Sequence, residues 1–559
     1  MANRYLDRLR RNFRDLAGER FCTLVGPGGA TTLSWDGLER DCAVWGAAYR
    51  AAGLAAGDQA LIFLRHTPEL YGSYFGAMLE GLTPSFMPCS SPRQDPGLYW
   101  ASHAELMRHI QPAAVVADAA TFAEMAAAGL DLGEARRIEV EALDRTAAAA
   151  FAEDVPEEAT ALLQHSSGTT GLKKGVALSY RAITEQVESY AAAIGLDGSD
   201  AIVSWLPLYH DMGLIACCVT PAYLGTPIVH IDPFHWLVKP GLLFDHLQAE
   251  GAAGRAGFTW LPNFAFDHLA AICGRQAAQW DLKGVRAFIN CSEPCKPASF
   301  DRFLAAFEAG GARPEQLQCC YAMAESVFAV RQTAVGAPAH RTTVAAGSLD
   351  RGKRPAPPQA GEEGVELVEC GQAVDGIEVR VLDEAGDVLP AGTVGEIALS
   401  GRFMFEGYNR DPARTAERMK DGLYRTNDLG FVDADGRLYV LGRLDDLIII
   451  NGRNLYAHEV EAVANKVAGV KPGRVVAMSE FNERVGSEVL LIAAEQRTGD
   501  ERPRAEIQRD IQTAVHSVFS VVPHRIVVVD EGSLVKTTSG KISRKENLAR
   551  FGEPKGVRP

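Results

Sequence analysis

The chain has 559 residues, of which 47% are hydrophobic and 23% charged, so it can bury large cores and predicts two to four domains. Its formal net charge of −15 argues against a general nucleic-acid-binding or anionic-membrane surface, because both attract clustered basic residues. An anionic substrate would need local positive charge instead.

Cysteine usage and hydropathy favour a cytoplasmic protein. The eleven cysteines form no CxxC pair and no metal-type cluster with histidine, so we interpret them as reduced, mostly buried thiols. The N-terminal sequence MANRYLDRLRRNF lacks the apolar core and cleavage site of a secretory signal, so export is not expected. The longest uncharged segment, residues 212–229, is interrupted by Pro221, Gly225 and Pro227, which predicts buried core strands and turns rather than a membrane span.

The first two-thirds of the chain alternate between helical and strand-like patterns. Helical periodicity covers residues 181–194 and 298–309, and short β-rich runs cover residues 201–205, 226–231 and 287–289. Alternation of this kind predicts parallel sheets covered by helices.

Near residue 377 the pattern changes to short strands. Residues 377–382, 395–400 and 437–441 are strand-like and are separated by Asp, Gly and Pro turns. They predict a smaller, largely antiparallel β region. Residues 331–369 before it are rich in Ala, Pro, Gly and charge, which predicts a long surface insertion, with a disordered connector as the alternative.

The C-terminal part mixes helix and strand signals. After Gly-Arg-Leu-Asp-Asp at 442–446, residues 458–467 and 504–519 have helical periodicity, and residues 474–478 and 488–494 are β-rich. These patterns predict a small α+β domain of about a hundred residues. The predicted division is an N-terminal domain over residues 1–444 and a C-terminal domain over residues 445–559.

A phosphate-binding loop is the strongest local signal. Residues 166–175, Ser-Ser-Gly-Thr-Thr-Gly-Leu-Lys-Lys-Gly, bring together glycines, four hydroxyls and two lysines. Glycine permits close backbone approach, N–H groups and hydroxyls can donate to phosphoryl oxygens, and Lys173 or Lys174 can offset charge. The spacing is not that of a Walker loop, because only two residues separate Gly168 from Gly171. An ordinary turn is the alternative interpretation.

Five separated motifs follow one another in an order that chance would rarely produce. They are the loop at 166, Leu-Pro-Leu-Tyr-His-Asp at 206–211, Tyr-Ala-Met-Ala-Glu at 321–325, Tyr-Arg-Thr-Asn-Asp at 424–428 with Gly442-Arg443, and Thr-Ser-Gly-Lys at 538–541. Together they resemble the adenylate-forming ligase superfamily of acyl-CoA synthetases, adenylation domains and luciferases. The resemblance implies an α/β fold: a large N-terminal domain of helix-covered sheets plus a small β-barrel-like region, hinged to a small α+β C-terminal domain.

The resemblance also implies an ATP site. Tyr321 resembles the aromatic residue that stacks on adenine, and Asp428 resembles the carboxylate that accepts hydrogen bonds from both ribose hydroxyls. Arg443 would add a ribose or phosphate contact. The other residues implied at the nucleotide are Ser166, Ser167, Gly168, Thr169, Thr170, Gly171 and Lys174 in the loop, Ser292, Glu293 and Pro294 beside adenine, and Ala322 and Met323 after the tyrosine. Each has a plain alternative as a turn residue, a strand end or a surface ion pair.

Catalytic roles are implied for three residues and a hinge role for a fourth. Glu325 resembles the carboxylate that holds Mg²⁺ beside the ATP phosphates, and hard oxygen ligands suit that ion. Lys541 matches the catalytic lysine, whose ammonium can bridge the substrate carboxylate and the α-phosphoryl oxygens. His210, beside Asp211, is either a contact to the substrate or phosphate region or a satisfied interior histidine. Asp445 matches the hinge residue, with a plain turn aspartate as the alternative.

The reaction implied is attack of a substrate carboxylate on the α-phosphorus of ATP, which expels pyrophosphate and leaves an acyl-adenylate. No general base is required, because the carboxylate is already ionised near neutral pH. Catalysis consists mostly of positioning and charge neutralisation.

Within the superfamily the chain looks closest to fatty acyl-AMP ligases, which implies transfer of the acyl group to an acyl carrier protein or to a polyketide or nonribosomal assembly line. The features are residues 206–214, the long insertion before Cys370 and residues 451–459. His210 stands where amino-acid-activating relatives have Asp, so a nonpolar acid fits better. Ile449 stands where CoA ligases have Lys, which weakly favours a carrier-protein acceptor. Our guesses for the acyl pocket are Trp205, Leu206, Met212 and Phe264, with plain core residues as the alternative.

The chain departs from the family pattern at four positions. Lys173 replaces the usual loop proline, Ala322 the usual glycine after the tyrosine, Asp445 a lysine that is common in the fatty acyl-AMP ligase branch, and Ala457 a common proline. The methyl group of Ala322 could narrow the path of an acyl group or adenine. Two other functions compete with a fatty acyl-AMP ligase. One is an acyl-CoA synthetase that uses free CoA, and the other is a catalytically silent nucleotide-binding regulator, against which the presence of both Glu325 and Lys541 argues.

Overall fold

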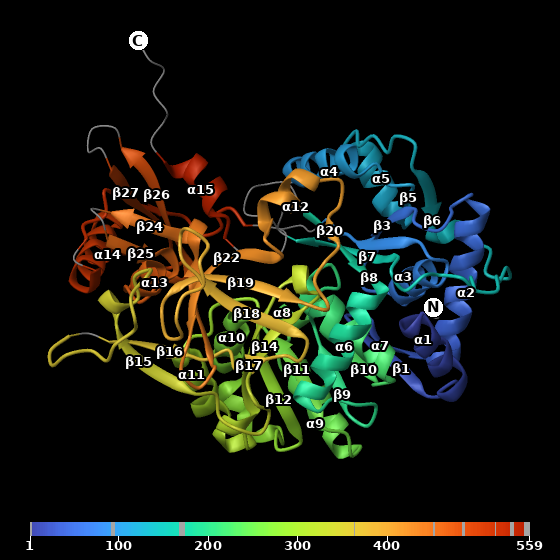
Figure 1. Cartoon of the computed structure of the whole chain (residues 1–559), viewed down its shortest axis with the longest axis horizontal. Helices are drawn as coiled ribbons and strands as arrows, with labels where there is room; N and C mark the ends of the chain where they lie inside the picture. The colour runs from blue at the N-terminus through green and yellow to red at the C-terminus, as the bar shows by residue number, and fades with distance from the viewer. Residues whose placement is uncertain are drawn as a thin grey trace, which may run out of the picture.

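A computed structural model describes residues 3–90, 96–166, 174–362, 364–450, 453–482, 487–519, 521–536 and 542–552. Figure 1 shows blue, green and yellow segments packed together in one large body, with the red C-terminal segment grouped at one end. The following paragraphs concern only the described residues.

The centre of the large body is a nine-stranded sheet. In spatial order its strands are β17 (Gln372–Ala373), β14 (Ala329–Gln332), β13 (Leu317–Ala322), β12 (Val285–Asn290), β11 (Gly257–Leu261), β9 (Ala201–Ser204), β10 (Ile228–Ile231), β1 (Arg20–Gly26) and β2 (Gly29–Ser34). The strands from β13 to β1 pair in parallel, and both edges are antiparallel. Every residue of β11 is buried, as expected of a strand covered on both faces. The predicted parallel sheet is confirmed.

Helices surround this sheet, and the two predicted at residues 181–194 and 298–309 are present as α6 and α11. The surrounding helices are α1 (Arg4–Asp15), α2 (Trp35–Ala51), α6 (Tyr180–Ile194), α7 (Thr220–Leu224), α8 (Pro233–Val238), α9 (Leu242–Ala252), α10 (Asn263–Cys273) and α11 (Pro297–Phe307). Helix α6 begins where the Ser179 side chain accepts a hydrogen bond from Ala182 N, and it ends at Gly195, whose φ is 64°. Hydroxyl caps and left-handed glycines are ordinary helix boundaries.

A second, four-stranded parallel sheet lies next to the first. Its order is β4 (Thr83–Phe86), β3 (Gln59–Phe63), β5 (Ala114–Ala117) and β6 (Arg136–Glu139), accompanied by α3 (Glu69–Leu79), α4 (Pro96–Ile110) and α5 (Ala119–Ala127). Strands β20 (Gly407–Tyr408), β8 (Lys174–Ser179) and β7 (Thr160–Ser166) form a small third sheet. Strand β8 is thus flanked by a segment more than two hundred residues further along the chain.

The predicted antiparallel β region is present. It contains β18 (Ile377–Leu382), β19 (Gly395–Gly401), β22 (Leu423–Val432), β21 (Met419–Lys420) and β23 (Leu438–Arg443), with α12 (Pro412–Arg418) beside it. Residues 331–369 contain an antiparallel pair, β15 (Arg341–Ala345) with β16 (Gly364–Val368). The described part of this insertion is therefore partly ordered by strand pairing.

The C-terminal residues have their own buried core. The elements are β24 (Leu447–Ile450), β25 (Arg453–Tyr456), α13 (Ala457–Ala464), β26 (Val470–Asn482), β27 (Ser487–Gln496), α14 (Arg504–Phe519), β28 (Arg525–Val529) and α15 (Arg544–Phe551). Two hydrophobic clusters contain only described residues from 448 onwards. A third cluster joins Tyr456 to Val344, Leu349 and Tyr439. This separation supports the predicted boundary near residue 445, which stays a prediction.

The strand prediction for residues 212–229 is largely wrong. Residues Met212–Val219 form a π-helix, followed by α7, and only β10 at the end is a strand. A short apolar run does not distinguish strand from buried helix by periodicity, and Pro221 is tolerated because it lies in the first turn of α7. No helix in the described ranges is both long and apolar enough to cross a membrane.

Candidate functional site

Tyr321 and Asp428 meet although 107 residues separate them. Tyr321 lies near the end of β13 and Asp428 lies on β22, and the Tyr321 hydroxyl donates to Asp428 Oδ2 over 2.5 Å. Asp428 faces Arg443 in the register between β22 and β23, with 3.4 Å between Arg443 Nε and Asp428 Oδ1. The residues predicted for adenine and ribose are therefore in direct contact.

The Asp428 carboxyl is largely but not fully buried, with 16% of its side chain exposed. Burial raises the pKa of its carboxyl above the ordinary value, although Arg443 and the Tyr321 hydroxyl lower it. Burial and the adjacent carboxylate likewise raise the pKa of the Tyr321 hydroxyl well above its usual value. An ionised carboxylate in a buried position is stabilised by hydrogen-bond donors, and the two hydroxyls of a diol could act as such donors.

Glu325 lies in a single 3₁₀ turn, Ala324–Ser326, between β13 and β14. Its side chain is mostly buried, and the Tyr408 hydroxyl donates to Glu325 Oε1 over 2.7 Å. The hydroxyls of Tyr408 and Tyr424 are 3.1 Å apart. The turn ends at Val327, whose φ of 63° is unfavourable for a β-branched residue. Glu325 is thus held by a tyrosine pair at a strained turn.

The two ends of the predicted phosphate loop lie in the same small sheet as Tyr408. Ser166, at the end of β7, is opposite Lys174, at the start of β8, and Tyr408 on β20 is opposite Val176 on β8. Asn409 N donates to Gly175 O over 2.7 Å. Of the predicted loop residues, Ser167, Gly168, Thr169, Thr170 and Gly171 lie outside the described residues, as does Lys541.

The segment after β12 has contacts that the sequence analysis does not anticipate. Glu293 Oε2 accepts a hydrogen bond from Phe264 N over 3.0 Å, at the start of α10. Ser292 has a φ of 70°, and its hydroxyl is 3.9 Å from Met212 Sδ. Pro294 is exposed. These contacts join the predicted adenine segment to the predicted acid side, while the roles of the three residues stay predictions.

His210 and Asp211 form a pair at the start of the π-helix. His210 Nδ1 lies 2.6 Å from Asp211 Oδ1, and the same oxygen accepts a hydrogen bond from Met212 N over 2.8 Å. The backbone at Gly213 comes very close to Pro207. A Cβ atom on Gly213 would lie 2.3 Å from Pro207 O, so only glycine fits at this position. Asp211 therefore caps the π-helix, and its carboxylate lies within ion-pair distance of the imidazole.

The residues predicted to line the acyl pocket lie in or beside a cluster of aromatic rings. Trp205, Leu206 and Met212 are at most 6% exposed. The indole of Trp205 stacks on that of Trp236, with ring centroids 3.7 Å apart and nearly parallel planes. Phe264 packs edge-on against Trp205 and is itself 45% exposed.

The predicted hinge residue lies in a 3₁₀ turn, Leu444–Asp446, directly after β23. The next residue, Asp446, pairs with Arg544 over 2.9 Å, and Arg544 also donates to Glu461 Oε1 over 2.9 Å. The sequence analysis missed Arg544 as well as Tyr408. Tyr424 was part of a quoted motif, but no local pattern marks Tyr408 or Arg544.

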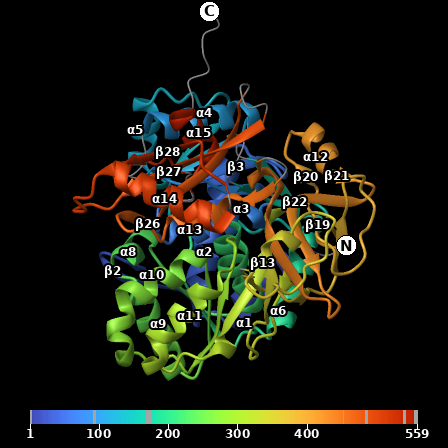
Figure 2. The same cartoon turned by 90° about the vertical axis from the view of Figure 1, so that its left-hand side faces the viewer.

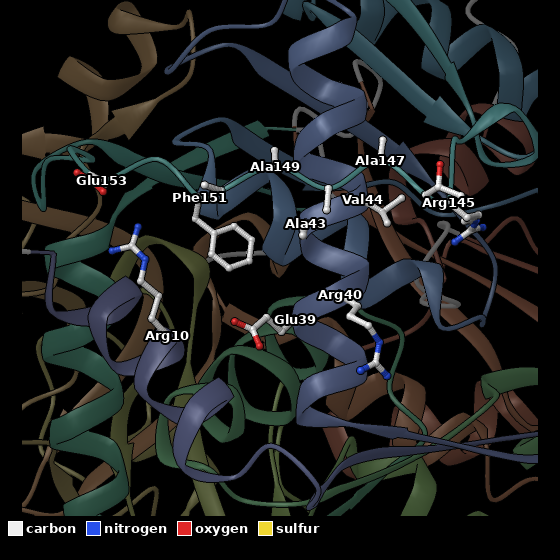
Figure 3. Close-up of a pocket in the computed structure, with 13 residues that line it drawn as sticks. Arg10, Glu39, Arg40, Ala43, Val44, Arg145, Ala147, Ala149, Phe151 and Glu153 are labelled. Carbon is white, nitrogen blue, oxygen red and sulfur yellow. The ribbon is translucent and has the colours of Figure 1, made fainter.

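A surface pocket of about 700 Å³ lies away from these residues. Figure 3 shows Arg10 on α1, Glu39 and Arg40 on α2, and the alanine-rich segment that includes Ala149 around it. No predicted site residue lines it. The chemistry of the motifs, rather than pocket size, therefore identifies the candidate site.

Comparison with known proteins gives the family. Residues 13–409 match the AMP-binding enzymes, so the chain belongs to the AMP-binding enzyme family. The long-chain-fatty-acid–AMP ligase FadD32 of Mycobacterium marinum is 29% identical over 566 residues, covering 91% of this chain and 89% of FadD32. The medium-chain-fatty-acid–[acyl-carrier-protein] ligase JamA of Moorena producens is 29% identical over 418 residues, covering 72% of this chain and 69% of JamA.

The fold has close counterparts among solved structures. A structure from a study of fatty acyl-adenylate ligases of E. coli and L. pneumophila superposes with a TM-score of 0.87 and 23% identity, covering 98% of this chain and 97% of that one. The predicted α/β fold is confirmed, as is the resemblance to adenylate-forming ligases of the fatty acyl-AMP type.

Proposed function

We propose that the protein activates a fatty or other nonpolar carboxylic acid with ATP, releases pyrophosphate and transfers the acyl group to the phosphopantetheine thiol of an acyl carrier protein. The observation that carries this proposal is the contact between Tyr321 and Asp428, with Glu325 four residues beyond Tyr321. The names of FadD32 and JamA support the acid and the carrier protein.

The nucleotide would lie at the ends of β13 and β22. In this proposal Tyr321 stacks on adenine, Asp428 and Arg443 hold the ribose, and Ser166 and Lys174 mark the ends of the loop around the phosphates. The charge-assisted hydrogen bonds that Asp428 can form are stronger in a buried site than in water.

Glu325 fits a Mg²⁺ ligand, because it is a mostly buried carboxylate whose orientation the Tyr408 hydroxyl fixes. When bound, Mg²⁺ would neutralise charge on the phosphate oxygens. Each carboxylate oxygen has more than one acceptor position, so a hydrogen bond from Tyr408 is compatible with binding of the ion.

Lys541 would be the group that reaches the reacting atoms. Its ammonium would bridge the acid carboxylate and the α-phosphoryl oxygens. In the proposed cycle the C-terminal domain then rotates at Asp445, which removes Lys541 from the reacting atoms and admits the thiol.

The eleven free thiols of the chain favour a reducing compartment, so the proposed location is the cytoplasm.

Exchange of radiolabelled pyrophosphate into ATP tests the first step. We expect exchange only when a nonpolar acid is added, and no exchange with any acid would refute the proposed enzyme and leave a nucleotide-binding regulator. The second step is tested by offering free CoA or a phosphopantetheinylated carrier protein to the preformed adenylate. Faster acylation of CoA than of any carrier would identify an acyl-CoA synthetase instead.

A further inference from the structure

A chain of buried hydrogen bonds reaches the motif at residues 206–211 from the interior of the large body. His230 lies on β10, and its Nε2 atom is 2.9 Å from Leu206 O, the carbonyl of the first motif residue. Its Nδ1 atom is 2.7 Å from the Tyr71 hydroxyl on α3. The thiol of Cys22 on β1 donates to the same hydroxyl oxygen over 3.4 Å. Figure 2, like Figure 1, shows α3 between α2 and β3.

These contacts fix the protonation of the His230 ring. A carbonyl oxygen can only accept, so Nε2 carries the proton and donates to Leu206 O. Nδ1 then has a lone pair, to which the Tyr71 hydroxyl donates. Burial lowers the pKa of His230 to about 3, so the ring is neutral near neutral pH. The ring of His66 packs edge-on against it, with centroids 4.7 Å apart. The imidazole is thus held in one tautomer and one orientation.

The motif needs such support because the turn that precedes the π-helix has no strand or helix of its own. Both backbone groups of Leu206 are bonded by side chains, since Leu206 N donates to Ser204 Oγ over 3.1 Å and Leu206 O accepts from His230. Gln164 on β7 donates to Tyr209 O over 3.0 Å. Buried backbone groups need partners, and here side chains from three strands supply them.

His230 supports one end of this turn, and His210 lies at the other. His210 N donates to Pro207 O over 3.1 Å, and Leu214 N donates to His210 O over 2.8 Å. The close approach of Gly213 to Pro207 leaves no free space inside the turn. Close-packed segments transmit displacement, so a shift of Leu206 would move His210 as well.

We propose that His230 is a positioning residue for adenylate formation, which holds Leu206 O and thereby places His210 in its predicted contact with the substrate or phosphate region. Tyr71 keeps the His230 ring in the tautomer that can donate. This inference rests on the proposed function. His230 takes no chemical step itself, because it is only 2% exposed and both of its nitrogen atoms bond protein groups. Its contribution is a fixed place for the motif, on which catalysis by positioning depends.

The Tyr71 hydroxyl is tested first. Tyr71→Phe removes only the group that donates to His230 Nδ1. The matched control is Tyr74→Phe on the same helix, because the Tyr74 ring is equally buried and its hydroxyl has no hydrogen-bond partner among the described residues. We expect Tyr71→Phe to lower kcat for pyrophosphate exchange about fivefold and the control to leave it unchanged. Equal effects of the two variants would overturn the inference.

Two changes of His230 separate its nitrogen atoms. The amide of His230→Gln can reach the place of Nε2 and keep a donor to Leu206 O, whereas the shorter amide of His230→Asn reaches only the place of Nδ1. We expect exchange to fall about thirtyfold in His230→Asn and to stay within about threefold of the unchanged protein in His230→Gln. Losses of the same size in both variants would show that the ring serves packing alone and would overturn the inference.

A double-variant cycle distinguishes positioning from simple destabilisation. Tyr71→Phe is combined with His210→Ala, and exchange is measured well below the thermal unfolding midpoint of each variant. If Tyr71 acts through His210, Tyr71→Phe has no further effect once the His210 imidazole is absent. A smaller folded fraction would instead lower exchange by the same factor in both backgrounds, and that result would overturn the inference.

These outcomes are separable from failure of the proposed function. If the unchanged protein exchanges pyrophosphate with no acid, the proposed activity itself is wrong. If the unchanged protein exchanges pyrophosphate and His210→Ala does so equally well, adenylation stands and only the positioning role is wrong.

Discussion

The nucleotide side and the acid side of the candidate site are built in opposite ways. On the nucleotide side, hydrogen bonds join side chains from strands far apart in sequence, as between Tyr321 and Asp428 or Tyr408 and Glu325. On the acid side, the stacked rings of Trp205 and Trp236 fill the space by van der Waals contact. Directional bonds fix one ligand geometry, whereas apolar packing tolerates ligands of different length. The difference predicts a strict nucleotide requirement and a graded acid preference.

The largest effect should come from the residue proposed to act where the two sides meet. Lys541→Ala should lower pyrophosphate exchange by about a thousandfold with every acid, because the bridging charge acts in the transition state. ATP binding, measured by calorimetry, should stay within about threefold. Lys545→Ala is the control in the same segment. Unchanged exchange in Lys541→Ala would remove this lysine from the reaction.

Next in size is a change on the acid side. Trp236→Leu should lower the free energy of unfolding by about 3 kcal/mol, because it removes a fully buried indole from the stack. Denaturant unfolding measures this loss. Affinity for ATP should change less than twofold, since no hydrogen bond of the nucleotide side is touched. A parallel loss of ATP affinity would break the distinction between the two sides.

Asp428→Asn should act on the nucleotide side alone. We expect the Kd for ATP to increase about thirtyfold, by the same factor with every acid present, because a charge-assisted hydrogen bond becomes a neutral one. An acid-dependent factor would contradict this prediction.

The same variant should be more stable than the unchanged protein near neutral pH. Burial raises the pKa of Asp428, so its carboxyl binds protons more tightly in the folded state than in the unfolded state. Stability from this group is therefore lost as pH rises past the unfolded pKa of about 3.9. Asp428→Asn should gain about 1 kcal/mol of unfolding free energy at pH 7 and nothing at pH 3. Urea unfolding at both pH values checks the sign.

The smallest effect concerns the orientation of Glu325. Tyr408→Phe removes only the hydroxyl that bonds Glu325, so exchange should fall about fivefold and the Mg²⁺ concentration for half-maximal activity should rise. Calorimetric titration of MgATP should show the same weakening. Tyr180→Phe, which removes a buried hydroxyl bonded to Met78 O, is the matched control. An unchanged Mg²⁺ dependence would show that Tyr408 serves packing only.

Sequence patterns predicted the parallel sheet, the antiparallel region and helices such as α6 and α14, because their hydrophobic periods and boundary residues agree with the fold. Motif order predicted that Tyr321, Asp428 and Arg443 would converge. Tyr408 could not be predicted, since its role depends on β20 pairing with β8 across the chain. The π-helix at Met212–Val219 was also missed, because an apolar run fits several buried structures.

The contacts of Arg544 affect which residues would move together in the proposed rotation of the C-terminal domain at Asp445. Its partners Asp446 and Glu461 both lie beyond Asp445 in the chain, so all three travel together when the backbone turns at that residue. The ion pairs of Arg544 with Asp446 and Glu461 therefore do not have to break when the backbone turns at Asp445. In the proposed rotation Arg544 would therefore move as one body with Asp446 and Glu461, the residues that its guanidinium holds.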